Sequence, residues 1–288
     1  MNNRLPEWFR QEIPDPSTRT TMQLLAKRKV HTVCRQAHCP NAGRCFKSGE
    51  MTFLILGDVC TRACLFCAVQ KAPAQPSAPA VQEPQRIARL ARELGLTYVV
   101  ITSVTRDDLG DGGAGHFART IRALRAIDKK VKVEALIPDF CGRNSALKTV
   151  VDSGPAVLAH NLETVRRLHS RLKPDASYAR SLGVLRKIKS ISPQQLTKSG
   201  LMLGLGEGQG DVIETMKDLR RVRCDILTLG QYLAPGRSYY PVRAFIGPQQ
   251  FKAYQQRALE LGFTKVLAGP LVRSSYQARQ LYREALYA

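Results

Sequence analysis

Residues 52–67 read TFLILGDVCTRACLFC, and this stretch decides the fold and much of the chemistry. Its first part, TFLIL (52–56), is a short apolar run of the kind found in buried parallel strands. Three cysteines follow at once, Cys60, Cys64 and Cys67, with the spacing C-x3-C-x2-C. Because the functional loops of parallel α/β folds follow the carboxyl ends of strands, this placement predicts a site at the rim of a parallel sheet.

The rest of the chain repeats the order of strand and then helix. The sequence predicts strands at 52–56, 98–103, 132–137, 156–160, 200–205 and 225–230, and helices near 84–94, 116–128, 144–152, 161–170, 177–190 and 210–222. This alternation predicts an α/β fold with a parallel sheet and right-handed crossovers. Six such units are too few to close an eight-stranded barrel, so we expect a partial, TIM-like (β/α)6 barrel. A doubly wound sheet is the alternative.

Three parts of the chain are expected from this pattern. Residues 1–50 would form an N-terminal extension, 51–263 the partial barrel and 264–288 a C-terminal extension. Within the last part, a strand at 265–269 and a helix at 276–287 would be an appendage that closes one side of the barrel.

Composition and charge narrow the classes of protein. The 288 residues are 44% hydrophobic, which is globular composition and excludes a disordered chain. There is no run of about 18 apolar residues, so no membrane association is expected. The first residues lack an apolar core and carry acids, which argues against a secretory or transit peptide and predicts a cytoplasmic protein. The 44 Lys and Arg outnumber the 23 Asp and Glu, and this net charge of +21 favours acidic partners.

The three cysteines of 60–67 point to an iron–sulfur cluster with an open position. Three thiolates can hold three irons of a [4Fe–4S] cube, whereas zinc motifs and ferredoxins normally supply four ligands. The fourth iron is then free to bind a small molecule. Chance spacing of buried or zinc-binding thiols is the alternative.

A second group of cysteines, Cys34, Cys39 and Cys45, has the spacing C-x4-C-x5-C. Zinc is the alternative metal at these cysteines, with His31 or His38 as the fourth ligand. Clustered cysteines in a chain of this size favour metal binding over a disulfide scaffold. Cys141 and Cys224 stand apart and are expected to be buried thiols.

The C-x3-C-x2-C spacing, with Phe66 beside Cys67, resembles the signature of the radical S-adenosylmethionine (SAM) superfamily. From about residue 28 to about residue 286 the chain resembles the lipoyl synthase family. The resemblance rests on HTVC (31–34), HCPNAGRC (38–45), TFLILGDVCTRACLFCAV (52–69), YVVITSVTRDDLGDGGA (98–114), LIPDF (136–140), VLAHNLETV (157–165), TKSGLMLGLGE (197–207), GQYLAPG (230–236) and AGPLVRSSY (268–276). The chain departs from the family at Leu65 and Gly110, where the family usually has proline.

The resemblance implies a transferase that carries two [4Fe–4S] clusters and uses SAM. Cys60, Cys64 and Cys67 would hold the cluster that cleaves SAM to a 5′-deoxyadenosyl radical. Cys34, Cys39 and Cys45 would hold an auxiliary cluster, consumed as the sulfur donor, with a serine of RSSY as its fourth ligand. We assign that ligand to Ser275, and Ser274 remains the alternative.

The implied reaction inserts two sulfur atoms, at C6 and C8 of an octanoyl chain on a lysine of a carrier protein. The implied partners are octanoylated lipoyl carrier proteins, either acidic lipoyl domains or H protein, and an electron donor such as ferredoxin or flavodoxin. One rival is a radical SAM enzyme that acts on tRNA. Another is a basic, metal-stabilised RNA-binding module, but no helix-turn-helix, zinc-finger, RNP or KH signature is present, so we expect no nucleic-acid partner.

Several residues are candidates for binding SAM. Gly204 and Gly206 lie in GLGEG (204–208), where a glycine-rich strand end would let the backbone approach the ligand. Asn161 and Glu163 follow the fourth strand and could meet the methionine, adenine or ribose groups, or could instead cap a helix. Arg180 could meet the methionine carboxylate, with an exposed helix arginine as the alternative.

Overall fold

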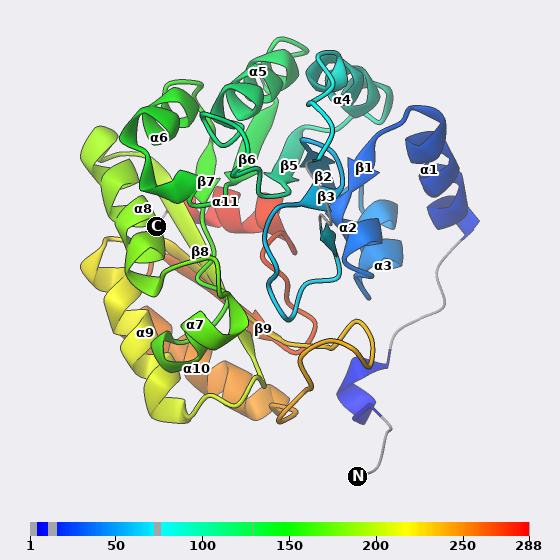
Figure 1. Cartoon of the computed structure of the whole chain (residues 1–288). Helices are drawn as coiled ribbons and strands as arrows, with labels where there is room; N and C mark the ends of the chain where they lie inside the picture. The colour runs from blue at the N-terminus through cyan, green and yellow to red at the C-terminus, as the bar shows by residue number, and fades with distance from the viewer. Residues whose placement is uncertain (1–4, 11–15, 72–75, 129, 288) are drawn as a thin grey trace.

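Eight strands form one curved sheet, in the order β1-β2-β5-β6-β7-β8-β9-β10 (Figure 1). The computed structural model describes residues 5–10, 16–71, 76–128 and 130–287. All neighbouring strands are parallel except β1 and β2, which are antiparallel. The strands are β1 (His31–Thr32), β2 (Thr52–Ile55), β5 (Tyr98–Ser103), β6 (Lys132–Leu136), β7 (Val157–Ala159), β8 (Leu196–Leu203), β9 (Ile226–Gln231) and β10 (Lys265–Gly269).

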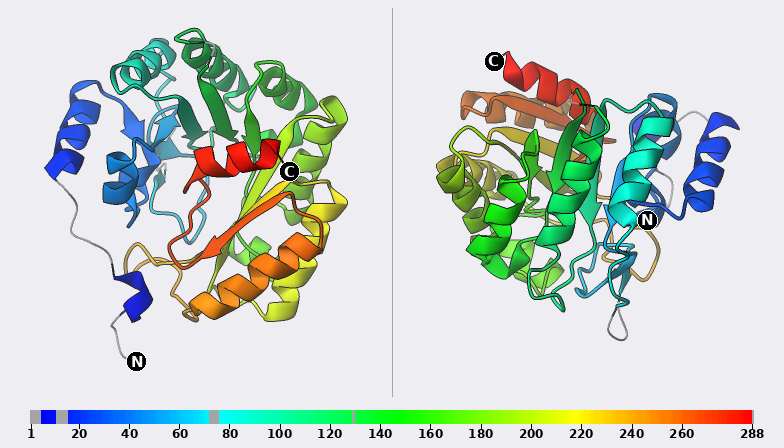
Figure 2. Two further views of the ribbon diagram at one scale, coloured as in Figure 1. Left: turned by 180° about the vertical axis from the view of Figure 1, so that it is seen from behind. Right: turned by 90° about the horizontal axis from the view of Figure 1, so that it is seen from above.

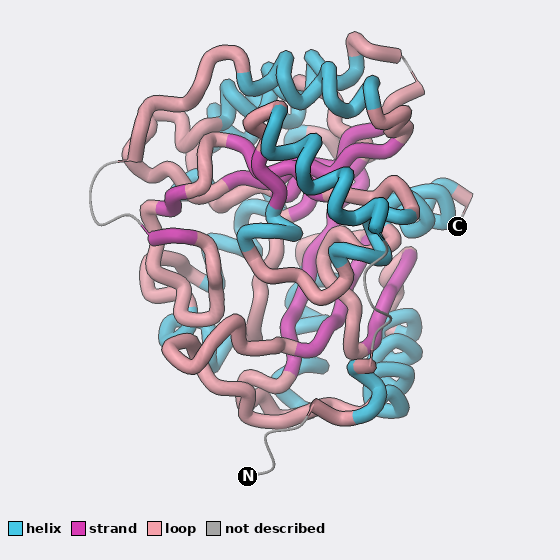
Figure 3. The backbone as a smooth tube through the Cα atoms, turned by 90° about the vertical axis from the view of Figure 1, so that its right-hand side faces the viewer, coloured by secondary structure: helices cyan, strands magenta, loops and turns pink. Residues whose placement is uncertain are grey.

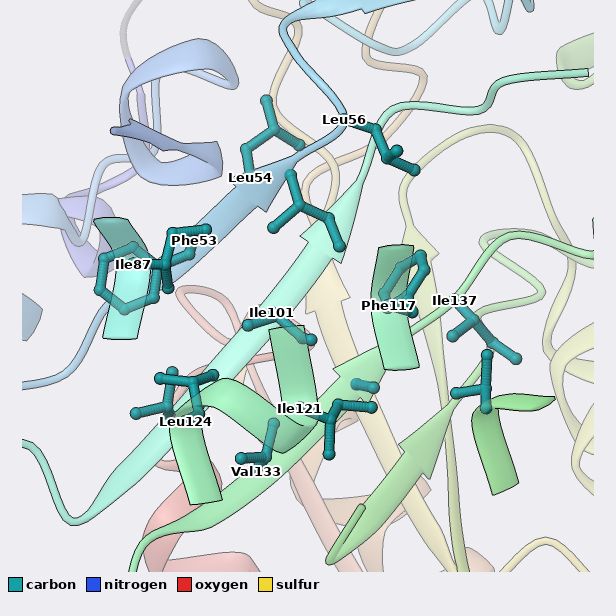
Figure 4. Packing of buried hydrophobic residues seen from close by; sticks show 14 of the residues in the cluster. Phe53, Leu54, Leu56, Ile87, Ile101, Phe117, Ile121, Leu124, Val133 and Ile137 are labelled. Atoms are coloured by element: carbon teal, nitrogen blue, oxygen red, sulfur yellow. The ribbon is translucent and has the colours of Figure 1, made fainter. Parts of the chain in front are cut away.

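The outer face of this sheet is covered by helices (Figures 1 and 2). They are α4 (Glu83–Glu93), α5 (Ala114–Arg125), α6 (Asn144–Val151), α8 (Tyr178–Ile191), α9 (Gln209–Arg221) and α10 (Pro248–Glu260), with the short α7 (Arg166–Leu172) after β7. Figure 4 shows part of the core that this arrangement buries, where Ile87, Phe117 and Ile121 of the helices meet Phe53 and Ile101 of the strands. The β-branched and bulky strand residues are buried because the helices cover them.

The partial α/β barrel expected from the sequence is confirmed. The sheet starts at β1 and ends at β10, and within the described residues these two edges are not paired, so the barrel stays open. The strand expected at 265–269 forms as β10, and it is a full member of the sheet, paired in parallel with residues 226–230 of β9. The boundary expected after residue 263 falls between helix α10 and strand β10. The residues after it therefore begin with a strand of the same sheet as the barrel.

The N-terminal elements lie beside the open side of the barrel. They are η1 (Glu7–Phe9), α1 (Pro16–Lys27), α2 (Val33–Gln36) and α3 (Ala42–Lys47). A separate two-stranded sheet pairs β3 (Val59–Cys60) with β4 (Gln70–Lys71), and a 3-10 turn, η2 (Phe140–Gly142), follows β6.

The C-terminal helix α11 (Ala278–Leu286) closes the amino-terminal end of the barrel. Its Leu281 packs with Ile226 and Leu196, the first residues of β9 and β8, and its Tyr282 ring lies 5.5 Å from that of Tyr98, the first residue of β5. In Figure 3 most loops lie on the opposite side, where the strands have their carboxyl ends. That side is therefore left for a site.

Among the helices that the structure describes, none combines the length and the apolar character that crossing a bilayer requires.

Candidate iron–sulfur and SAM site

The loop of Cys60, Cys64 and Cys67 lies at the carboxyl rim, directly after β2. Neighbouring segments fix the loop through hydrogen bonds, in which Thr61 N–H donates to Thr105 O (3.0 Å) and Leu65 N–H donates to Leu172 O (3.0 Å). All three cysteines line one open cavity, and no other described cysteine lines it. The sequence prediction that this triad faces a space at the rim agrees with this geometry.

The three thiols are free and crowd one another. Burial raises the pKa of Cys64 to about 12, Lys173 opposes this rise, and the nearby Cys67 and Cys60 reinforce it. Burial likewise raises the pKa of Cys67. Three partly buried thiolates would repel each other without a cation between them, so this donor set fits a cationic iron site better than three separate thiols.

Two residues that line the same cavity carry buried polar atoms without partners among the described residues, which suits a polar ligand. His160 Nε2 and Ser103 Oγ are buried, and within the described part of the chain neither has a hydrogen-bond partner. Burial lowers the pKa of His160 to about 4, and its Nδ1 lies 2.9 Å from Ile137 O, so the ring is neutral at physiological pH. Buried polar groups are costly unless they are satisfied, and a ligand such as SAM carries the donors and acceptors to satisfy them.

Asn161 and Glu163 also line this cavity, as the sequence suggested. Asn161 Nδ2 donates to Glu163 Oε1 at 3.1 Å, and burial raises the pKa of Glu163. The alternative role as a helix cap is wrong, because α7 begins only at Arg166 and its cap position is Val165. Glu163 instead has a left-handed backbone (φ 69°) and bridges to Leu201 of β8, which holds its side chain at the cavity. Such strain in a residue other than glycine is typical of functional sites.

Arg180 is not among the residues that line the cavity. Its Nε lies 3.0 Å from Asp139 Oδ2, and its side chain is one-third exposed at the start of α8. Asp139 does line the cavity, so Arg180 contacts the cavity only indirectly, through its ion pair with this carboxylate.

Gly204 and Gly206 also lie apart from the residues that line the cavity. Both have a left-handed backbone, with φ 93° and 106°. A side chain at Gly204 would collide with Gln231 and with Ala244 O, so the close approach expected there is made by the chain itself and not by a ligand. Gly200 of the same strand instead packs closely against Asn161, because a Cβ added there would lie 3.1 Å from Asn161 Oδ1.

An arginine network that the sequence did not reveal braces the cysteine loop. Arg62, between the first two cysteines, is buried, and its guanidinium donates to both Asp107 oxygens (2.7 and 3.0 Å) and to Asp139 Oδ1 (2.6 Å). These hydrogen bonds raise the pKa of Arg62 against the effect of its burial, and its own N–H donates to Cys60 Sγ at 3.5 Å. The available signal was the position of the acids, because Asp107 and Asp139 follow two successive predicted strands.

The aspartates after β5 have different tasks. Asp111 orders its own turn by accepting from Gly113 N–H (2.8 Å) and Gly115 N–H (2.7 Å). Asp108 pairs with the buried Arg106 at 2.7 Å. Asp107 instead reaches the cysteine loop through Arg62.

Cys34, Cys39 and Cys45 also lie together, on α2, the turn after it and α3. Burial raises the pKa of Cys34 to about 11, and Cys39 contributes to the rise. Burial raises the pKa of Cys45 to about 12, and both other thiols reinforce it. The structure places neither histidine as an evident fourth ligand, since His31 Nδ1 lies 3.8 Å from Asp58 and His38 is exposed.

The C-terminal segment runs between the two triads. Asn41, at the start of α3, donates its Nδ2 to Leu271 O at 2.6 Å, across 230 residues of sequence. Arg273 lies close enough to Cys39 for their charges to interact. Ser274 Oγ donates to Asn161 Oδ1 at 3.0 Å, and thus reaches the residues that line the other cavity. Ser275 lines a separate cavity with Ser48 and Glu50, near the end of α3.

The two isolated cysteines differ from each other. Cys224 is fully buried, as expected. Cys141 is exposed, so the expectation that it is buried is wrong: it lies in the η2 turn, with φ 52°, and its Sγ donates to Asp107 Oδ1 at 3.2 Å.

Comparisons with known proteins identify the family of this chain. The family profile described as the radical SAM superfamily matches residues 54–219, which include the second cysteine triad and the Asn161–Glu163 segment. The lipoyl synthase of Trichlorobacter lovleyi is 51% identical over 275 residues, which cover 96% of this chain and 97% of that protein. The lipoyl synthase of Caldanaerobacter subterraneus subsp. tengcongensis is 50% identical over 278 residues, with the same two coverages.

Solved structures that share the fold are more distant. The hydrogenase maturase HydG from Carboxydothermus hydrogenoformans superposes with a TM-score of 0.62 at 12% identity, over 81% of this chain and 56% of that one. Methylornithine synthase gives a TM-score of 0.58 at 15% identity, over 81% of this chain and 68% of that one. Identities this low describe the fold alone.

Proposed function

This chain belongs to the lipoyl synthase family of the radical SAM superfamily, and from that membership we propose how its residues divide the work. The reaction is the insertion of sulfur at C6 and C8 of an octanoyl group that is amide-linked to a protein lysine, which makes the enzyme a sulfurtransferase. When bound, the clusters and SAM supply the radical that removes hydrogen from unactivated carbon and the sulfur that replaces it. The remaining task of the protein is to hold the clusters, to orient SAM and the octanoyl chain, and to enclose them away from water.

Cys60, Cys64 and Cys67 would hold the cluster that binds SAM. They supply three thiolates at one cavity, and three ligands leave one iron of a cube open. Asn161 and Glu163 would orient the methionine and nucleoside parts of SAM, because both side chains reach the same cavity from the strained turn after β7. His160 and Ser103 would satisfy further polar atoms of the ligand, since each now has an unused buried atom there.

Cys34, Cys39 and Cys45 would hold the auxiliary cluster, with Ser275 as its fourth ligand. The C-terminal segment supports this role, because the hydrogen bond of Asn41 to Leu271 brings the segment of Ser275 to α3. Ser274 is engaged with Asn161 at 3.0 Å, which leaves Ser275, whose cavity is also lined by Ser48 and Glu50 just after α3. Gly204 and Gly206 are assigned to the turn after β8 rather than to SAM, and Arg180 to the support of Asp139.

The observation that carries the proposal is the Ser274–Asn161 hydrogen bond. The C-terminal segment contacts Asn41, in the region of the first triad, through Leu271. Through Ser274 it contacts Asn161, which lines the cavity of the second triad, so one segment links the two sets of cysteines. An enzyme that transfers atoms from one cluster to a radical formed at another needs this proximity. Octanoylated lipoyl domains or H protein would supply the substrate, and ferredoxin or flavodoxin the electrons, in the reducing cytoplasm where free thiols persist.

Cysteine variants test the proposal. Cys60→Ala, Cys64→Ala and Cys67→Ala should each lose SAM cleavage and about half of the iron per chain. Cys34→Ala, Cys39→Ala and Cys45→Ala should lose the same share of iron, retain SAM cleavage and form no lipoyl group. Deoxyadenosine, lipoyl product and iron are measured in parallel after anaerobic reconstitution. Lipoyl formation by a variant of the first triad, or SAM cleavage stimulated by tRNA and not by octanoyl-lysine peptide, would contradict the assignment.

A further inference from the structure

A groove between α1 and α4 is lined almost entirely by cationic side chains. Figure 1 shows the two helices as neighbours on the outside of the barrel, beside β1 and β2. The end of α1, the two residues after it and the outer face of α4 supply six cations, and Glu93 is the only acid among the described residues that line the groove. The lining residues are Lys27, Arg28, Lys29, Arg86, Arg89, Arg92 and Glu93.

The spacing on α4 makes this face basic. Arg86, Arg89 and Arg92 recur at i, i+3 and i+6, so they share one side of the helix, while Ile87 and Leu90 on the other side are fully buried. The cations are therefore held next to each other by a packed helix, and like charges at this spacing destabilise it slightly.

Most of these charges are unused within the protein. Arg28 pairs with Glu93 at 2.9 Å, but within the described chain none of the other five cations makes an ion pair. Around α9 basic charge is compensated, because Arg166 and Arg221 both pair with Asp218. The groove is thus a concentrated, uncompensated positive surface.

The groove is connected to the rim of the cysteine loop. Lys29 and Arg86 also line the next cavity, together with residues 56–59, which lead directly into Cys60. The first residue of α4, Glu83, holds this connection, because its carboxylate accepts the N–H of Leu56 at 2.8 Å and lies 2.7 Å from His116 Nε2. A partner seated on α4 would therefore lie beside the entrance to the proposed active site.

We propose that this groove is the docking surface for an acidic face of the protein that carries the octanoyl-lysine. The inference rests on the proposed function, since it names where the partner of that reaction binds. Charge complementarity carries it: a surface with six cations and one acid favours an anionic partner, and steering by such a surface raises association rates. The lining contains no aromatic side chain on which bases could stack, which favours a protein over single-stranded nucleic acid.

Paired charge reversals test the groove. Arg89→Glu with Arg92→Glu changes two exposed groove residues, and Arg119→Glu with Arg122→Glu is the matched control on the neighbouring α5, with the same spacing and the same change of net charge. The groove variant should raise KM for an octanoylated acidic lipoyl domain about tenfold, because two attractions become repulsions. It should weaken binding of that domain to the holoenzyme without SAM, measured by fluorescence anisotropy, to a similar extent.

The control and a short substrate separate the possible failures. The control variant should keep KM and anisotropy within about twofold of wild type, and both variants should convert an octanoyl-lysine peptide as wild type does. Equal effects of the two variants would overturn the docking surface. If the wild-type enzyme binds tRNA, the groove variant does not, and KM for the lipoyl domain is unchanged, the groove is a nucleic-acid site and the proposed docking surface is wrong. A wild-type enzyme that converts neither peptide nor domain would refute the proposed function instead.

Discussion

Arg62 shows how one side chain can set the shape of the cysteine loop. It lies between two cysteines of the loop, and its guanidinium, 6% exposed, is shared by Asp107 and Asp139. Breaking such a buried pair by removing one partner leaves a buried charge, so Arg62→Gln should lower the free energy of unfolding by about 3 kcal/mol. It should also release iron faster from the reconstituted protein. Urea unfolding and the rate of iron loss to a chelator measure the two effects.

The pH dependence of the stability lost in Arg62→Gln distinguishes a charge effect from a packing effect. Burial alone would raise the pKa of Asp139, but the hydrogen bond and charge of Arg62 outweigh it and hold that pKa below its usual value. The ionised form of Asp139 therefore stabilises the fold above its unfolded pKa of about 4, and this contribution disappears as the pH falls through the lower folded value. The difference between wild type and Arg62→Gln should shrink below about pH 4. A difference that persists there would mean that packing is the cause, and Arg62→Lys, which keeps the charge, should lose less than Gln at neutral pH.

The two serines of RSSY should behave differently, although they are adjacent. Ser275→Ala should make the auxiliary cluster labile, because alanine has no oxygen with which to bind the iron. SAM cleavage should survive. Ser275→Cys should give a cluster that resists opening and forms little lipoyl product, since thiolate is a softer and better ligand for iron than alkoxide. Ser274→Ala, the matched control, should keep the cluster and raise KM for SAM, because its partner Asn161 lines the SAM cavity. Near-normal lipoyl yield from both Ser275 variants would eliminate it as a ligand.

At the scale of elements, Asn41 fastens the C-terminal segment to α3. Its amide is 2% exposed and donates to Leu271 O at 2.6 Å. Asn41→Ala should cost about 1–2 kcal/mol of stability, because the partly buried carbonyl of Leu271 loses its partner. Hydrogen exchange should rise in residues 270–277 and stay unchanged in β5 and β6, which the segment does not join. Protection of 270–277 equal to wild type would show that other contacts hold the segment.

The elements also show what the sequence could and could not predict. The strand at 98–103 was predictable because it is a continuous β-branched run, and it forms as β5 with the same bounds. The strand predicted at 200–205 begins earlier, at Leu196, because the polar residues Thr197, Lys198 and Ser199 belong to it and are all buried. Lys198 pairs there with Glu134 at 2.8 Å, so a rule that seeks apolar runs misses a strand whose polar side chains are satisfied by partners on other strands.

The sequence analysis missed helix α10 for a different reason. Its buried side is only Phe251, Tyr254 and Ala258, set among glutamines and charged residues, so the apolar stripe is too thin to recognise. In the candidate site the same limit applies. The cysteines are visible as a pattern of spacing, whereas the Arg62 network depends on which strand ends the fold brings together.

At the scale of the whole molecule, the net charge of +21 makes recognition of a folded partner sensitive to salt. Exposed opposite charges are screened over about 8–10 Å at physiological ionic strength, so kcat/KM for an octanoylated acidic lipoyl domain should fall steeply between 50 and 300 mM salt, by about tenfold or more. An octanoyl-lysine tripeptide has no acidic surface, so its kcat/KM should change by less than about twofold over the same range. The comparison is internal, since both substrates share the same chemistry and the same two clusters. A parallel fall for domain and peptide would locate the salt effect in the active site and not in docking, and the basic surface would then serve something other than the carrier.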